Sequence, residues 1–109
     1  MLSVLSIEEL LPLEVEKAIE YLNLNAIKSP ISGLFWRELP YEFLTKEQKN
    51  YLEQGGELKV AIEVKKNSIR VELLVRSESL TNEGGGKLTK IQLEYILLFT
   101  DKILDYMTR

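Results

Sequence analysis

Residues 58–76 have the sequence LKVAIEVKKNSIRVELLVR, and this stretch decides the fold that we expect for the chain. Apolar and polar residues alternate in it twice, with the apolar positions at Leu58, Val60, Ile62 and Val64 and then at Ile69, Val71, Leu73 and Val75. A period of two is typical of a β-strand with one buried face. The stretch therefore predicts a β-hairpin with its turn at Lys66 and Asn67.

The position of this turn sets the register of the hairpin. It pairs the apolar residues with one another: Val64 with Ile69, Ile62 with Val71, Val60 with Leu73 and Leu58 with Val75. On the other face it places Glu63 opposite Arg70, which is a favourable pair of charges. Because a shift of one residue would turn every apolar side chain to water, we expect this alignment in the folded protein.

Helices are predicted before and after the hairpin. Residues 13–25 carry apolar side chains at helical spacing and charged side chains on the opposite side. Residues 90–107 are apolar over most of the helix circumference, and Thr89 followed by Gln92 has the spacing of a capping box. Thr45 and Gln48 have the same spacing, so a short helix is expected over residues 46–54.

The remaining segments complete the expected fold. Ser6 and Glu9 also have capping-box spacing, so we expect a helix to start there. Residues 31–37 could form a strand, but their apolar residues favour neither face. The chain is thus expected to be one α+β domain, residues 1–109, with two layers. An antiparallel sheet of two or three strands, including the hairpin at about 58–76, would carry the helices at about 13–25 and 90–107 on one face.

Charge and composition exclude several classes of function. The 14 Lys and Arg residues against 17 Asp and Glu give a net charge of −3, which disfavours binding to nucleic acid or an anionic membrane. The chain has no cysteine and no histidine, so thiolate nucleophiles, serine–histidine triads and zinc sites built from these residues are excluded. We expect a cytoplasmic protein with no metal, no cofactor and no signal peptide.

Two groups of residues could bind an anion. Gly85, Gly86 and Lys87 lie shortly before a predicted helix and could bring backbone amides to a phosphate, although the spacing of a P-loop is not met. The hairpin also carries a basic group with carboxylates interleaved, namely Lys59, Lys65, Lys66, Arg70 and Arg76. Interleaved signs are typical of ion pairing on a solvated sheet, which is the simpler interpretation.

The last predicted helix has more apolar surface than a narrow sheet can cover. At about 100° per residue, Lys90, Glu94, Asp101 and Asp105 occupy only about 60° of its circumference, and apolar residues span roughly 260°. Its three carboxylates could hold Mg²⁺ or Ca²⁺, but a solvated face explains them as well. We predict a homodimer or protein partner that contacts Leu93, Leu97, Leu104 and Trp36. The alternative is that Trp36, Phe43 and the N-terminal segment cover the helix within the monomer.

No sequence motif identifies the process that the chain serves. The main hypothesis is a non-catalytic protein-interaction domain, such as an adaptor, a chaperone-like protein or a complex subunit, that acts through apolar helical surface. The alternatives are a small-molecule or anion-binding domain that uses the Gly-rich loop and the hairpin basic residues, and an enzyme that uses carboxylate, Tyr and Lys groups. In size, acidity and a strand core flanked by helices, the chain resembles the small acidic chaperones of secretion systems, with which it shares no motif.

Overall fold

The computed structural model describes residues 3–77 and 85–109 of the chain. In chain order its elements are β1 (Val4–Ile7), α1 (Pro12–Asn25), β2 (Ile27–Lys28), β3 (Leu34–Arg37), a 3-10 turn (Tyr41–Phe43), α2 (Lys46–Glu53), β4 (Leu58–Val64), β5 (Ile69–Glu72), β6 (Leu74–Ser77), β7 (Gly86–Lys87) and α3 (Lys90–Met107). The predicted α+β class and the bounds of the last helix are confirmed.

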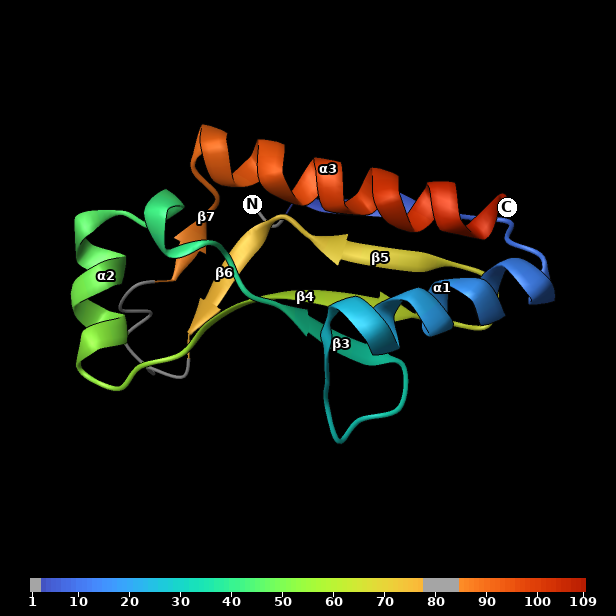
Figure 1. The fold of residues 1–109 in the computed structure, drawn as a ribbon, viewed down its shortest axis with the longest axis horizontal. Helices are drawn as coiled ribbons and strands as arrows, with labels where there is room; N and C mark the ends of the chain where they lie inside the picture. Colours follow the sequence, from blue (N-terminus) through green and yellow to red (C-terminus); the bar gives the residue numbers. More distant parts are fainter. Residues whose placement is uncertain (1–2, 78–84) are drawn as a thin grey trace.

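The sheet is larger than the sequence indicates. Among the described residues seven strands pair in it, all of them antiparallel, with the order β1-β5-β4-β3-β2 and with β6 joining β4 to β7. The prediction of two or three strands was therefore wrong. Four of the seven strands have only two or four residues and lie outside the hairpin, too short to show a period of two. Helices α1 and α3 run along one face of this sheet (Figure 1).

The N-terminal segment shows why one strand was missed. Ser6 lies in β1, and its hydroxyl donates to the Glu8 carboxylate at 2.6 Å instead of capping a helix. At Glu9 the backbone has a φ of 58°, in the left-handed region, so the chain turns there. Helix α1 begins at Pro12, where a proline loses no hydrogen bond, and the Glu14 carboxylate accepts from the Leu11 amide at 2.8 Å.

Half of the predicted hairpin register is confirmed. Near the turn, β4 and β5 pair Val64 with Ile69, Glu63 with Arg70 and Ile62 with Val71. Further from the turn, however, the strand paired with β4 is β6, and Leu58 lies opposite Ser77. The two pairs predicted at that end, Val60 with Leu73 and Leu58 with Val75, are therefore wrong, because the partner strand is shifted by two residues. The amide of Leu73 donates to the Ser3 carbonyl at 2.9 Å, so the chain bends toward β1 where the hairpin was expected to continue.

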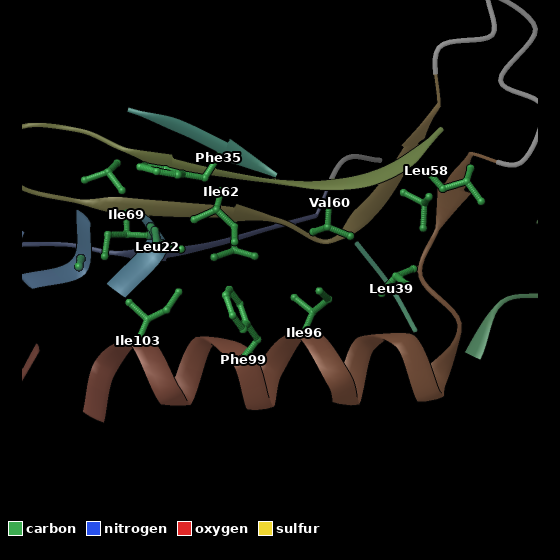
Figure 2. Close-up of a cluster of buried hydrophobic side chains, with 14 of the residues drawn as sticks. Leu22, Phe35, Leu39, Leu58, Val60, Ile62, Ile69, Ile96, Phe99 and Ile103 are labelled. Atoms are coloured by element: carbon green, nitrogen blue, oxygen red, sulfur yellow. The ribbon is translucent and has the colours of Figure 1, made fainter. Parts of the chain in front are cut away.

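The hydrophobic core lies between the sheet and the two long helices. Figure 2 shows side chains of α3 pointing toward side chains of β4 and β5: Ile96, Phe99 and Ile103 from the helix, and Val60, Ile62 and Ile69 from the strands. Helix α1 adds Ala18 and Leu22, both of them 0% exposed. The apolar alternation that predicted the hairpin therefore identifies the face that the helices cover.

Two helix caps meet in a buried polar contact. Thr45 and Thr89 each cap a helix, together with Gln48 and Gln92 respectively, as their spacing predicts. The Gln92 amide nitrogen also donates to Oε1 of Gln48 at 2.8 Å and to the Phe43 carbonyl at 2.9 Å. Since Gln92 is 0% exposed, these bonds replace the water that its amide loses. The contact joins the start of α3 to α2 and to the 3-10 turn.

The pairing of β3 settles which way the aromatic residues point. Phe35 lies opposite Ile62 and is buried in the core, whereas Trp36 lies opposite Ala61 on the other face. The chain enters β3 through Gly33, whose φ of 80° favours glycine. The Gly33 carbonyl accepts from the Val64 amide at 2.7 Å. A Cβ at this position would lie 2.5 Å from the Val64 carbonyl oxygen, so only glycine allows this close approach.

Candidate functional site

The surfaces of helix α3 differ around its circumference. Its inner face holds Ile96, Phe99, Ile103 and Met107 in the core. On one side it packs against α1, where the Tyr21 ring lies 5.9 Å from the Phe99 ring and 5.4 Å from the Tyr106 ring, centre to centre. The predicted interaction residues Leu93, Leu97 and Leu104 lie on the opposite side of α3, and we call them the leucine flank.

The leucine flank is only partly covered. Leu104 packs against the core and Leu93 is half-buried, whereas Leu97 is 40% exposed. Since α1 lies against β2 and β4, the side of α3 away from α1 faces the β5 and β1 side of the sheet. The flank therefore lies above the edge of the sheet that β1 forms.

Strand β1 leaves backbone groups free along this edge. Among the described residues, no strand pairs with its outer side. The Leu73 amide donates a hydrogen bond to the Ser3 carbonyl, so the backbone groups of Ser3 point toward β5. Leu5 and Ile7, opposite Val71 and Ile69, follow at intervals of two residues. In an antiparallel ladder the direction of the backbone groups alternates, so Val4 and Ser6 point theirs away from the sheet. Within residues 3–77 and 85–109, the leucine flank is thus partly uncovered and the outer edge of β1 is unpaired, both at the same edge of the sheet.

The carboxylates of α3 lie beside the leucine flank. Glu94, Asp101 and Asp105 are exposed, and Asp105 forms an ion pair with Arg109 at 3.6 Å. The part of the chain that the structure describes contains no group of three or more side chains able to hold a metal ion. Beyond this stripe of charge, Leu98 is 61% exposed. The charged stripe therefore separates the leucine flank from a second apolar position.

Trp36 does not join the leucines. It lies on the outer face of the sheet, the face away from α3, with the Lys59 ammonium 5.3 Å from the centre of its ring. Of the residues that could cover α3 within the monomer, Phe43 does make contact, because its ring lies 5.9 Å from that of Tyr95. Residues 4–7 pair with β5 as a strand and leave Leu97 exposed. The predicted interaction residues therefore belong to two surfaces, one on each side of the sheet.

Two hollows adjoin Trp36 on the outer face of the sheet. One measures about 220 Å³ and is lined by Trp36, Ala61 and Arg70, together with neighbouring residues of β3, β4, β5 and β6. The other measures about 590 Å³ and includes Lys59. Both hollows are lined by Trp36 and Arg76, so they are neighbours. Sequence reasoning missed this site because the outward position of Trp36 depends on the pairing of β3.

The Gly-rich segment is only partly described. Gly84 lies outside the described residues, and Gly86 and Lys87 form β7, opposite Val75 and Leu74. At the start of α3, the Thr89 hydroxyl accepts from the backbone amide of Gln92, so this backbone amide already has a hydrogen-bond partner. An anion site at Gly85, Gly86 and Lys87 remains a prediction.

The titratable groups with altered pKa values lie in ion pairs or hydrogen bonds with carboxylates. The Tyr106 hydroxyl donates to Glu20, and this bond raises the pKa of Tyr106. Glu53 raises the pKa of Tyr41 in the same way. Neither tyrosine lines the two hollows beside Trp36. Both bonds link separate elements of the fold, which is a structural role.

Comparison with protein-family models, with curated proteins and with solved structures finds no match for this chain. Among the described residues, no helix combines the length and the apolar character that crossing a membrane requires. The function of the chain is therefore inferred from its two uncovered surfaces.

Proposed function

We propose that the chain is a non-catalytic protein-interaction domain that forms a homodimer through the leucine flank of α3 and the free edge of β1. The support for this proposal is the exposure of Leu97 between Leu93 and Leu104, on the side of α3 that lies between its buried inner face and its exposed charged stripe. Apolar side chains grouped beside an unpaired strand edge are typical of a surface that another chain covers.

The arrangement suits a second copy of the chain. In a two-fold contact each protomer contributes the same surface, so Leu97 would lie near its own symmetry equivalent. The free backbone groups of Val4 and Ser6 would lie within reach of the same strand of the other copy, because two antiparallel edges can extend one sheet across the axis. Such a contact would cover the leucine flank and the edge strand together.

Sedimentation equilibrium of two matched variants tests the homodimer. At tens of micromolar we expect the wild-type protein to have twice the chain mass of 12.6 kDa. Leu97→Glu should sediment as a monomer, because it would bring two carboxylates together at the axis. Leu98→Glu makes the same chemical change one residue along, on the other side of the charged stripe, and should remain a dimer.

Two outcomes would overturn the proposal. One is a wild-type protein that sediments as a monomer throughout this concentration range. The other is an equal loss of dimer in Leu97→Glu and Leu98→Glu, which would place the contact elsewhere on α3. Both leucines are exposed, so circular dichroism should show that both variants keep the native fold.

A further inference from the structure

The outer face of the sheet carries basic charge on an acidic protein. Residues 58–77 include five basic residues and two acidic ones, a net charge of +3, namely Lys59, Lys65, Lys66, Arg70 and Arg76 against Glu63 and Glu72. The whole chain has a net charge of −3, so the rest of it carries −6. Complementary charge steers partners to a surface. An acidic partner is therefore less strongly repelled at this segment than at the remainder of the molecule, although the hollows on the outer face are lined by carboxylates as well as cations.

Among the described residues, ion pairing leaves two of these cations unused: Lys66 in the turn between β4 and β5, and Arg70 on β5. Each nearby carboxylate has a cation of its own: Glu57 with Lys59 at 2.9 Å, Glu63 with Lys65 at 3.8 Å, and Glu72 with Arg76 at 2.5 Å. Arg70 lies directly opposite Glu63 in the ladder, yet within the described ranges its guanidinium has no ion pair and no hydrogen bond. A guanidinium presents several donors in a plane that matches a carboxylate.

The unpaired guanidinium lines a depression that has both apolar and charged walls. Leu34, Trp36 and Ala61 form its apolar lining, and its charged lining consists of Arg70, Arg76, Glu63 and Glu72. Because Ala61 has only a methyl side chain and is flanked by much larger residues, the surface is hollowed there. The volume of about 220 Å³ is below the ~300 Å³ at which small-molecule pockets usually begin. This hollow by itself therefore has room for a single side chain of a larger partner.

We propose that the outer face of the sheet binds an acidic segment of another protein. A carboxylate of the segment pairs with Arg70, and a neighbouring aromatic or large aliphatic side chain occupies the depression over Ala61, against Trp36. The adjoining larger hollow continues the groove past Trp36, which suits an extended segment. This surface is on the opposite side of the sheet from the leucine flank, so the proposal does not depend on the homodimer.

Trp36 provides the readout, because it is the only tryptophan in the chain. We would titrate the full chain with the synthetic peptide DFELDFELD and follow tryptophan emission, using KFKLKFKLK as the control of opposite charge. The acidic peptide should change the emission with saturation and the basic peptide should not. Leu97→Glu should bind the acidic peptide as the wild type does, whether or not the homodimer exists.

A matched pair of variants separates the site from general charge attraction. Arg70→Gln and Lys65→Gln each remove one positive charge, but only Arg70 lines the depression. Arg70→Gln should raise the Kd for the acidic peptide about tenfold, which corresponds to the loss of a hydrogen bond to a charged group. Lys65→Gln should change it by less than about twofold, as an exposed charge does. Circular dichroism checks that both variants are folded.

Four results would overturn the proposal. The first is an emission that does not respond to the acidic peptide, and the second is an equal response to both peptides. The third is an equal loss of affinity in the two variants, which would indicate attraction without a site. The fourth is binding of phenylacetate as tight as that of the peptide, which would assign the depression to a small aromatic acid.

Discussion

The two faces of β4 differ although they belong to one strand of seven residues. On the inner face, Val60 and Ile62 are 0% exposed beneath the helices. On the outer face, Glu63 is exposed and Lys59 lies beside Trp36, and no helix of the described part of the chain covers them. Burial makes the inner face the source of stability, whereas the outer face keeps charged groups in contact with water.

Because of this difference, the core and the proposed recognition surface can be changed separately. Successive side chains of a strand point to opposite faces, so a substitution on the outer face leaves the core packing intact. The outer face can therefore carry an unpaired guanidinium and a hollow without loss of the core. Urea denaturation of variants on the two faces measures this separation as a difference in the free energy of unfolding.

The largest loss of stability should come from the inner face. Ile62→Ala should lower the free energy of unfolding by roughly 2 to 4 kcal/mol, because the lost side chain leaves a cavity beneath α3. The measurement is urea denaturation followed by circular dichroism. A loss of less than about 1 kcal/mol would contradict the placement of Ile62 in the core.

An intermediate loss should come from the buried contact between the helix caps. Gln92→Leu keeps the size of the side chain but leaves the Phe43 carbonyl without its donor, and should cost about 2 kcal/mol. Gln54→Leu is the matched control. Because Gln54 is exposed, this variant should lower the free energy of unfolding by much less. Similar values for the two variants would show that the bonds of Gln92 are not needed for the stability of the fold.

The smallest change should come from the outer face. Glu63→Gln removes an exposed ion pair with Lys65 at 3.8 Å and should change the free energy of unfolding by less than about 0.5 kcal/mol. Glu63 is the direct neighbour of Ile62 in the sequence, so the two variants compare the faces at one place in the strand. A loss as large as that of Ile62→Ala would mean that the two faces are not independent.

Local patterns predicted well wherever the physical cause is local. A capping box joins residues three apart, so Thr89 and Gln92 located the start of α3, and Thr45 and Gln48 that of α2. The same pattern failed at Ser6 and Glu9, because pairing with β5 holds Ser6 in a strand. A local signal was outweighed there by contacts with residues more than sixty positions away in the chain.

The hairpin shows a different limit. Alternation gives the face of each residue but not its partner, and an offset of two residues leaves the alternation unchanged. Leu58 is therefore buried as predicted although it lies opposite Ser77 and not Val75. Of the candidate interaction residues, Leu93, Leu97 and Leu104 could be predicted from the sequence, because the spacing that places residues on one side of a helix is a local pattern. The partners of Trp36, namely Ala61 across the ladder and Arg70 along the hollow, were not found.

The sequence alone determined the class of the fold, the bounds of α3 and the apolar face of the hairpin, because each depends on residues a few positions apart. Tertiary structure alone decided that β1 closes one edge of the sheet, that β6 replaces β5 as the partner of β4, and that Trp36 points away from α3. These features depend on which distant segments pair, and the free energy of pairing includes contacts that no local pattern contains.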